Sequence, residues 1–371
     1  MDWARKVLSE LRSQNLYRKR RVREGLLDFC SNDYLGLRDH PEVVEEAVKV
    51  LKETGLGSGA SQLVSGYTVY HRSLEEKLAE FKGVPRCVLF GSGYLANIGT
   101  IPVLAEEGDL ILSDELNHAS LIDGCRLSRA EKVVFRHKDY EQVREVLEKK
   151  RKSYRRVLIV TDSVFSMDGD MADIRTLLSV AEEFDCILYV DDAHGTGTIG
   201  EGRGVLREFG LKWTDRIVLM GTLSKALGSY GAFVCGSQDL VDLLVNRARS
   251  LIFTTSLPPP VCAGALKAVE ILEKNPELVE RLKERSLYIH RRLSELSLEV
   301  PFHGTPIIPI MVGEEEKALR ISEGLLRSGI LLRAIRYPTV PKGKARLRLT
   351  VSLRYREEDI DLLLDRLGEL I

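Results

Sequence analysis

The sequence lacks the marks of several protein classes. No apolar run approaches the roughly 20 residues that a membrane-spanning helix needs, and the first residues, Met1–Arg5, are polar. We therefore expect no membrane partner and no signal peptide, and a cytoplasmic location. The net charge at pH 7 is only −1. Because so small a charge offers no bulk electrostatic attraction to phosphate backbones, nucleic acid is not expected as a partner either.

The six cysteines are scattered along the chain and form no Cys-x-x-Cys pair. This spacing argues against a zinc site and against a disulfide scaffold, and it fits a reducing compartment. Cys186 and Cys235 lie within apolar runs, so we interpret them as small buried hydrophobic residues. No metal is predicted.

What the sequence does contain is a long series of short apolar runs that alternate with helical patterns. Predicted helices over residues 140–150 and 174–184 connect successive runs and complete βαβ units. Several runs are continuous, which is typical of strands covered on both faces. The expected fold class is α/β, with a mostly parallel, doubly wound sheet. The predicted strands are residues 87–90, 110–112, 132–135, 157–160, 187–190, 217–220 and 232–235.

The chain is predicted to have three parts. Residues 1–45 form an N-terminal helix and arm, residues 46–268 a large α/β domain, and residues 269–371 a smaller C-terminal α+β domain. Within the arm, Pro41 and Gly55 mark the beginning and end of a helix, because proline suits a first helical turn and glycine a helix end. The predicted apolar face of this helix is Val43, Val44, Ala47, Val48 and Leu51.

Chemically interesting residues follow two of the predicted strands. Lys225, surrounded by glycine and small residues, comes shortly after strand 217–220. Strand 187–190 runs into Asp191, and His194 follows three residues later. Ligands of open α/β sheets bind beyond the carboxyl ends of the strands. A lysine, a carboxylate and a histidine there suit pyridoxal 5′-phosphate (PLP), because the lysine forms the Schiff base and the carboxylate keeps the pyridine nitrogen protonated.

Three more segments follow strand ends. The turn Gly91–Tyr94 leads into a predicted helix, and its backbone N–H groups are available to a phosphate. On its own this turn is a weak signal. The other two segments, 113–120 and 161–170, are rich in polar residues.

Taken together, these segments resemble the α-oxoamine synthases, PLP enzymes of fold type I with the aminotransferase class I/II fold. The resemblance covers nearly the whole chain. It implies a large PLP-binding domain, a smaller C-terminal domain and an N-terminal arm. The motifs that carry it are Ser31–Leu37, Gly57–Gly59, Asn117–Ser120, Phe165–Asp170, Asp191–Gly195, the loop around Lys225 and Arg346–Arg348.

The resemblance implies catalytic roles for matching residues. Lys225 is implied as the Schiff-base lysine and proton shuttle, Asp191 as the partner of the pyridine nitrogen, and His194 as the partner of the phenolic oxygen. Asp192 is the alternative to Asp191, and the family spacing Asp-x-x-His favours Asp191. His118 is implied to stack on the cofactor ring, the alternative being an ordinary core or surface histidine.

The resemblance also implies a phosphate site and a quaternary structure. Ser92, Gly93, Tyr94 and Thr222 match the phosphate-binding residues. Thr255 matches a segment that reaches the phosphate from a neighbouring subunit. The chain is therefore expected to form a homodimer with shared active sites.

Substrate binding is predicted from arginines and a serine. Ser166 matches a serine near the cofactor and the substrate carboxylate, and Arg348 an arginine that clamps the amino-acid carboxylate. Arg346 is interpreted as an exposed strand arginine. Arg18 and Arg20 are candidates for binding an acyl carboxylate, with plain surface charge as the alternative.

Two segments, Val64–His71 and Ala334–Pro341, resemble the branch of the family that serves biotin biosynthesis by condensing L-alanine with a pimeloyl thioester. The alternative is the glycine C-acetyltransferase branch, which uses glycine and acetyl-CoA. Whether the acyl carrier is CoA or acyl carrier protein stays open. Tyr355 departs from the family pattern, since a histidine usually stands there.

Overall fold

The computed structural model of the protein describes residues 1–20, 22–296 and 298–371, and its contacts divide the chain into two compact units. This division differs from the predicted boundaries at residues 45 and 268. In the structure, the N-terminal arm groups with the C-terminal part. Unit 1 comprises Met1–Asn32, Met167–Gly169 and Lys283–Ile371, and unit 2 comprises Asp33–Ser166 and Asp170–Leu282.

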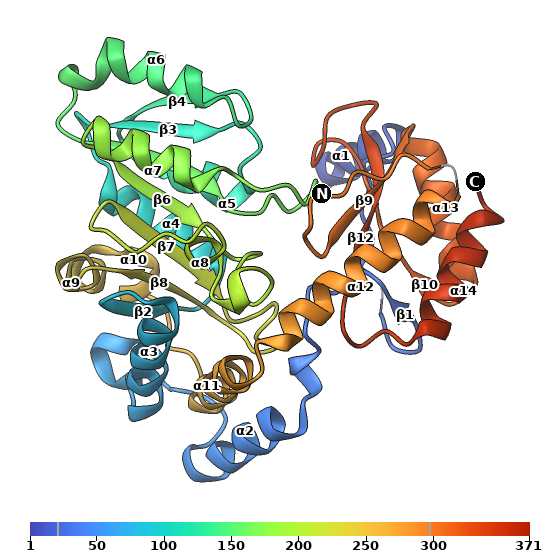
Figure 1. Ribbon diagram of the computed structural model, residues 1–371, viewed down its shortest axis with the longest axis horizontal. Coiled ribbons are helices and arrows are strands. Elements are labelled where there is room, and N and C mark those ends of the chain that lie inside the picture. Colours follow the sequence, from blue (N-terminus) through green and yellow to red (C-terminus); the bar gives the residue numbers. More distant parts are fainter. Residues whose placement is uncertain (21, 297) are drawn as a thin grey trace. The chain divides into compact units, whose positions relative to one another are not determined.

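Unit 2 is built on a seven-stranded sheet with the order β2-β8-β7-β6-β5-β3-β4 (Figure 1). The strand pairs from β7 to β4 are parallel, whereas β8 runs antiparallel to β2 and β7. All seven predicted strands are confirmed, and so is the α/β fold class. The strands are β2 (Arg86–Phe90), β3 (Leu110–Asp114), β4 (Glu131–Phe135), β5 (Val157–Asp162), β6 (Ile187–Asp191), β7 (Ile217–Thr222) and β8 (Ala232–Gly236).

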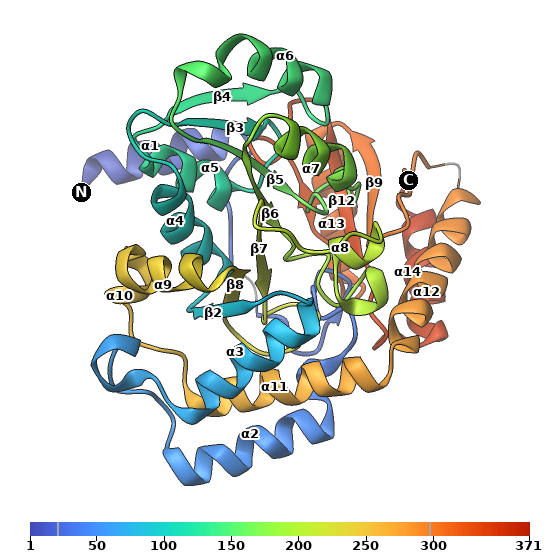
Figure 2. The same ribbon diagram turned by 60° about the vertical axis from the view of Figure 1, so that its left-hand side comes forward.

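Helices cover both faces of this sheet; in Figure 2, α4, α5, α9 and α10 lie on one side and α7 and α8 on the other. Alternate residues of a strand point to opposite faces. Val88 and Phe90 of β2 accordingly join one buried apolar cluster with Ala96 of α4 and Leu244 of α9. The helices of unit 2 are α2 (Pro41–Thr54), α3 (Val69–Lys82), α4 (Gly93–Leu104), α5 (Ala119–Leu127), α6 (Tyr140–Lys150), α7 (Ile174–Glu183), α8 (Val205–Glu208), α9 (Gln238–Arg247), α10 (Arg249–Ile252) and α11 (Pro259–Lys274).

Helix α2 begins at Pro41 and is capped by Gly55, as predicted, and it runs alongside α11 (Figure 2). Its apolar face differs from the prediction. The structure buries Val43 and Val50, whereas three valine and leucine side chains are exposed. The period of a helix identifies a stripe of apolar residues, but it does not say how much of the stripe the same chain covers. The exposed side chains are Val44, Val48 and Leu51.

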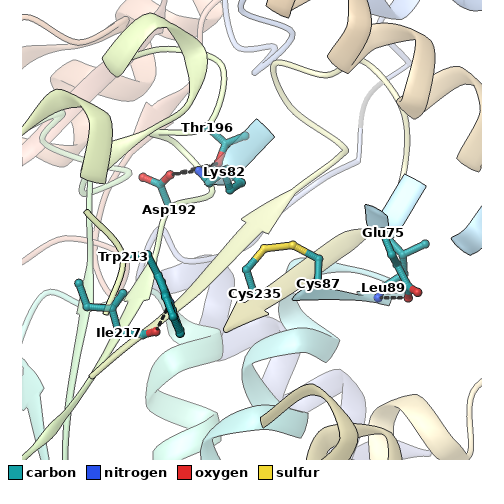
Figure 3. Close-up of a disulfide and its surroundings, with 9 residues drawn as sticks. All are labelled: Glu75, Lys82, Cys87, Leu89, Asp192, Thr196, Trp213, Ile217 and Cys235. Carbon is teal, nitrogen blue, oxygen red and sulfur yellow. Dashed lines mark hydrogen bonds and ion pairs between the residues drawn. A yellow bond between two sulfur atoms is a disulfide. The ribbon is translucent and has the colours of Figure 1, made fainter. Parts of the chain in front are cut away.

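A disulfide joins Cys87 of β2 to Cys235 of β8 (Figure 3). The two residues are direct partners in the antiparallel ladder, with Cα atoms 4.2 Å apart. The cysteine spacing argued against a disulfide scaffold and did not predict this bond; Cys235 is buried, as predicted, but it is not a free cysteine. The cysteines lie 148 residues apart in sequence, and only the order of the strands brings them together. Cys186 is buried and free, as expected.

Unit 1 contains a three-stranded antiparallel sheet and a two-stranded parallel pair. The pair joins β1 in the N-terminal arm to β10, which explains why the arm groups with the C-terminal part. The elements are α1 (Asp2–Ser13), β1 (Leu27–Asp28), β9 (Ile307–Gly313), α13 (Glu315–Arg327), β10 (Ile330–Leu331), β11 (Ala334–Ile335), β12 (Ala345–Thr350) and α14 (Glu357–Gly368), with α12 (Glu277–Ser294) extending into this unit from unit 2.

Tyr355, the departure from the family pattern, lies inside unit 1. Its hydroxyl donates to the backbone carbonyls of Asp28, at 3.0 Å, and Thr350, at 2.9 Å. Its ring centroid lies 4.5 Å from that of Phe29. These contacts tie the N-terminal arm to the end of β12. Within the described part of the chain, no helix combines the length and apolar character needed to cross a membrane.

Candidate active site

The carboxyl ends of β5, β6 and β7 border a cavity of about 200 Å³ in unit 2. Seven of the predicted site residues line it, coming from four separate segments of the chain. Parallel strands bring their carboxyl ends to one edge of a sheet, which is why residues far apart in sequence meet here. The seven are Gly93, Tyr94, His118, Asp191, His194, Thr222 and Lys225, and the remaining lining residues are Ser120, Asp162, Ala193, Met220 and Ser224.

Lys225 lies in the loop that follows β7, and Thr222 is the last residue of that strand. The Thr222 hydroxyl donates to the Gly231 carbonyl at 3.0 Å and accepts from the backbone N–H of Ser224 at 3.2 Å. Gly228 closes the loop with a φ of 63°. A Cβ atom at Gly228 would lie 2.3 Å from the backbone nitrogen of Arg38, so only glycine fits there. The small residues around the lysine thus shape its loop.

The adjacent aspartates Asp191 and Asp192 have different surroundings. Asp191 lines the cavity, and its oxygens accept hydrogen bonds from the Ala193 N–H, at 3.0 Å, and from Asn97 Nδ2, at 2.7 Å. Asp192 instead pairs with Lys82 Nζ at 2.7 Å, and both of these side chains are fully buried (Figure 3). The geometry favours Asp191 as the residue that faces a cofactor, since Asp192 is already neutralised.

His118 caps the N-terminus of α5. Its backbone N–H donates to Asp162 Oδ2 at 2.7 Å, and its Nδ1 accepts from the backbone N–H of Ser120 at 3.3 Å. Burial lowers the pKa of His118; the nearby Lys225 lowers it further, whereas Asp191 opposes the shift. The imidazole is therefore neutral at pH 7.

Asp162 is a cavity residue to which the sequence assigned no role. It ends β5 and lies in register beside Asp191 of β6. Burial, and then the neighbouring charge of Asp191, raise the pKa of Asp162 well above its usual value. Asp162 consequently favours its neutral form beside Asp191.

His194 is held by Tyr34, which the sequence also left without a role. The Tyr34 hydroxyl lies 2.6 Å from His194 Nδ1, and the tyrosine side chain is fully buried. Its signal was available in the sequence, because Tyr34 stands inside the motif Ser31–Leu37.

Three other predicted residues of unit 2 do not line the cavity. Ser92 is the N-cap of α4, and its Oγ accepts from the Leu95 N–H at 3.2 Å. Ser166 is half-buried in the turn after β5, and Thr255 is exposed and forms an isolated β-bridge with Ser61. Ser92 therefore shapes the phosphate turn through the helix it caps.

The two arginines of β12 belong to unit 1. Arg348 is largely buried; Nη1 and Nη2 each lie 3.2 Å from Asn32 Oδ1, and Nη1 donates to Thr350 Oγ1 at 2.8 Å. The interpretation of Arg346 as an exposed arginine is wrong, because this side chain is buried and pairs with Asp168. Strand β12 is central in its sheet, so its side chains are covered.

Arg18 and Arg20 also belong to unit 1, and the structure distinguishes them. Arg18 lines a cavity of about 620 Å³ and donates to Thr339 Oγ1 at 3.2 Å, whereas Arg20 does not line it. Burial and the nearby Arg18 lower the pKa of Arg336, another lining residue. The cavity is strongly basic. Its charged lining residues are Arg12, Arg18, Lys19, Glu323, Arg333 and Arg336.

The cavity of unit 2 suits PLP. An amine, a carboxylate and a neutral imidazole line it, and the N-terminus of α4 at Gly93 provides N–H groups for a phosphate. Asp191 lines this cavity and offers a carboxylate to a protonated pyridine nitrogen, held by Asn97 and the Ala193 N–H. The donor set therefore fits this cofactor.

Comparison with known proteins agrees with this assignment. A family profile described as aminotransferase class I and II matches residues 24–367. A protein of Aquifex aeolicus (strain VF5), named as a candidate 8-amino-7-oxononanoate synthase, is 63% identical over 371 residues, which is 100% of this chain and 99% of that protein. The 8-amino-7-oxononanoate synthase of Symbiobacterium thermophilum is 45% identical, covering 95% of this chain and 90% of its own.

A solved serine palmitoyltransferase, described as holding PLP as its internal aldimine, is 28% identical with a TM-score of 0.91. The similarity covers 100% of this chain and 96% of the solved chain. The chain belongs to the aminotransferase class I and II family and, within it, to the PLP-dependent α-oxoamine synthases.

Proposed function

We propose that this protein is a PLP-dependent acyltransferase of biotin biosynthesis, which condenses L-alanine with a pimeloyl thioester to give 8-amino-7-oxononanoate, CO₂ and the free carrier thiol. The observation that carries the proposal is the single cavity lined by Lys225, Asp191, His118 and His194. The names of relatives up to 63% identical over the whole chain support the choice of substrates.

Bound PLP supplies an electron sink for the carbanion that forms at the alanine Cα. Lys225 would hold the cofactor through Nζ, and its amine would serve as the base that takes the proton from the alanine Cα. Asp191 keeps the pyridine nitrogen protonated. His194, fixed by Tyr34, donates from Nε2 to the phenolic oxygen. Each of these roles is assigned to a side chain that lines the cavity, and Tyr34 fixes the His194 ring among them.

The remaining residues bind and orient. Backbone N–H groups at Gly93 and Tyr94 would bind the cofactor phosphate, at the end of the sheet where α4 begins, and Thr222 would donate to it by turning its hydroxyl from the Gly231 carbonyl. His118 covers the ring and returns a proton to the product from its Nε2–H. Because its neutral form is favoured by burial, it adds no charge that would compete with Asp191.

The substrate carboxylates need cations. Arg348 binds the alanine carboxylate with its planar guanidinium, helped by Ser166. Arg18, with Thr339, binds the distal carboxylate of the pimeloyl group, and the cluster of basic side chains in its cavity supports this role over Arg20.

The enzyme works as a homodimer in the cytoplasm. Thr255 does not line its own cavity and is exposed, which suits a residue that completes the phosphate site of a neighbouring subunit. Large apolar side chains at Leu63, Val64 and Phe253 are exposed by 54%, 79% and 69%, and a second subunit would cover them. The four free cysteines fit a reducing compartment, although the disulfide does not by itself favour one.

A substrate panel tests the proposed function. The purified holoenzyme is assayed with L-alanine or glycine against pimeloyl-CoA, pimeloyl carrier protein and acetyl-CoA, and the products are identified by mass spectrometry. L-Alanine with a pimeloyl thioester should give the highest kcat/KM. If glycine with acetyl-CoA is best, the protein is a glycine C-acetyltransferase.

Borohydride reduction followed by peptide mapping should place the pyridoxyl group on Lys225, and a label on another lysine would contradict the cavity assignment.

A further inference from the structure

The buried amide of Asn97 lies directly beside two of the residues in the proposed machinery. Asn97 belongs to α4 and is completely buried. Its Nδ2 donates to Asp191 Oδ2 at 2.7 Å and to Ser120 Oγ at 2.8 Å, and its Oδ1 accepts from the Tyr189 hydroxyl at 2.7 Å. Both N–H bonds and the carbonyl oxygen of this amide are therefore used.

Ser120 extends this set of hydrogen bonds to His118. Ser120 Oγ lies 2.7 Å from His118 Nδ1, and the Ser120 backbone N–H donates to the same nitrogen at 3.3 Å. Because Nδ1 accepts from a backbone N–H, the neutral imidazole carries its hydrogen on Nε2. Asn97 thus contacts the Asp191 carboxylate directly and the His118 ring through one hydroxyl.

We propose that Asn97 is a positioning residue, which holds the Asp191 carboxylate in place for the pyridine nitrogen and, through Ser120, keeps His118 in its Nε2–H form. The inference rests on the proposed function, because it takes Asp191 and His118 as the residues that face PLP. The Ala193 N–H binds one oxygen of Asp191 and Asn97 the other, so the carboxylate cannot rotate without losing a hydrogen bond.

An amide is the side chain that this position requires. A carboxylate in its place would repel Asp191, and a lysine would neutralise it and compete with the cofactor. A leucine of similar size would remove the hydrogen bonds of Asn97 to the buried hydroxyls of Tyr189 and Ser120 and to the Asp191 carboxylate. Only a neutral group with two donors and one acceptor satisfies all three neighbours.

The test begins with the apoprotein. Asn97→Leu should weaken PLP binding, measured by absorbance titration of the apoprotein, by about 10- to 100-fold, because it removes a hydrogen bond to a charged group. Nitrogen-15 NMR of the apoprotein should show that the preference of His118 for the Nε2–H form is weaker, because Ser120 Oγ is no longer oriented by Asn97. A residue that only supports the fold would lower the melting temperature and leave the His118 signal unchanged.

Ser120→Ala separates the two effects. It keeps the bond between Asn97 and Asp191, so PLP affinity should stay near that of the wild type, while the preference of His118 for the Nε2–H form weakens because Nδ1 loses the Ser120 hydroxyl and keeps only the backbone N–H. Ser128→Ala is the matched control, since Ser128 is also a buried serine but bonds to Ala105 and lies outside the cavity. It should change neither readout. If Asn97→Leu does not fold, Asn97→Asp preserves the shape and should also weaken PLP binding.

The inference is overturned if Asn97→Leu and Asn97→Asp both bind PLP within about twofold of the wild type, with an unchanged His118 signal. Asp191→Asn, titrated in parallel, distinguishes this failure from a wrong proposed function. If Asp191→Asn weakens PLP binding and the Asn97 variants do not, only the role of Asn97 is wrong. If Asp191→Asn also binds PLP like the wild type, the proposed function loses its basis.

Discussion

At the scale of single residues, the adjacent carboxylates Asp191 and Asp192 have different roles because their side chains have different neighbours. Asp191 ends β6 and lines the cavity, whereas Asp192 turns into the protein and meets Lys82. Gly195 is required by this second arrangement, because a Cβ there would lie 2.0 Å from Asp192 Oδ1. The motif Asp191–Gly195 therefore contains three residues that line the cavity, Asp191, Ala193 and His194, and two that build the loop around it, Asp192 and Gly195.

Replacing Asp191 or Asp192 by asparagine should have different effects, one on activity and the other on stability. Asp191→Asn should keep the melting temperature of the wild type and lower kcat/KM by about 100-fold or more, because the pyridine nitrogen loses its anionic partner. Asp192→Asn should destabilise the fold by about 3–5 kcal/mol, because it leaves the buried charge of Lys82 without a counter-charge. Steady-state kinetics and calorimetry check both. A stable Asp192→Asn variant with the larger loss of turnover would reverse the assignment.

His137 links two loops next to the site. Its Nδ1 lies 3.0 Å from Asp114 Oδ1, and its Nε2 lies 2.9 Å from Asp170 Oδ2. Burial alone would lower the pKa of His137, but the hydrogen bonds to these two carboxylates outweigh it and raise the pKa to about 9. The imidazolium therefore holds Asp170, at the end of the motif Phe165–Asp170, against the end of β3.

This raised pKa predicts how stability depends on pH. The folded pKa is above the usual value for an unfolded chain, so the stabilisation is complete below about pH 6.5 and disappears as the pH rises through 9. His137→Asn should lower stability by on the order of 2 kcal/mol at pH 6, and the difference should shrink at pH 10. Melting temperatures of the apoprotein at both pH values measure this. His290→Asn is the control, since the His290 ring bonds a backbone carbonyl. An equal effect of His137→Asn at both pH values would contradict the role of its charge.

Arg18 and Arg20 form a matched pair of variants. Arg18→Ala should raise the KM for pimeloyl-CoA about 10-fold or more, because a carboxylate loses its charged partner, and should leave the KM for L-alanine unchanged. Arg20→Ala removes an equal charge two residues away, outside the basic cavity, and should change neither constant. Similar effects of the two substitutions would mean that the arm acts through its general charge.

The sequence was sufficient to predict that Lys225, Asp191, His118 and His194 lie together, because each follows a strand and strand ends meet at one edge of the sheet; their catalytic roles stay predictions. It was not sufficient for Asn97, Ser120 and Tyr34. These residues act through hydrogen bonds to other side chains, and a local pattern carries no record of such partners. Asn97 did leave one trace, since it is a polar residue in an otherwise apolar helix, α4.

At the scale of elements, the disulfide between β2 and β8 is the feature with the clearest physical consequence. Strand β2 is at the edge of the sheet, and its last residue, Phe90, leads into the turn that begins α4. The disulfide therefore ties the strand that carries the phosphate turn to its neighbour β8 (Figure 3). It closes a loop between residues 148 apart in sequence, which restricts the unfolded chain strongly.

Removing this cross-link should lower the stability of the protein. The double variant Cys87→Ala/Cys235→Ala should lose up to about 5 kcal/mol in non-reducing buffer, and the reduced wild type should lose a similar amount. Thiol titration of the denatured, unreduced protein should find four thiols. Cys186→Ala, at a free and buried cysteine, is the control for loss of packing alone. A count of six thiols would show that the cross-link does not form.

Local sequence patterns predicted where the helices and strands lie better than they predicted which elements pack against one another. The strands and the limits of α2 and α6 follow from short-range hydrophobic periods, proline and glycine, which act on neighbouring residues. The disulfide, the exposed side of α2 and the burial of Arg346 depend on which elements become neighbours. Those contacts are set by tertiary packing over long sequence separations, so no local signal marks them.

At the scale of the whole molecule, the proposed homodimer would account for the exposed apolar side chains and for Thr255. Val64 and Phe253 are exposed, as are Val44, Val48 and Leu51 of α2, and burying such residues between subunits would remove them from water. Sites that share residues across a symmetric interface should be inactive in each single variant and active again in mixed dimers.

Mixed dimers of Lys225→Ala and Thr255→Ala subunits test this sharing. In such a dimer, Lys225 of one subunit and Thr255 of the partner subunit are both intact at one of the two sites. Random mixing of equal amounts should therefore restore about one quarter of the wild-type activity, provided that Thr255→Ala alone is strongly impaired. Lys225→Ala mixed with Asp191→Asn is the control, because both residues line the cavity of their own subunit and no intact site can form. Equal recovery in both mixtures, or none in the first, would place Thr255 in its own subunit's site or outside any site.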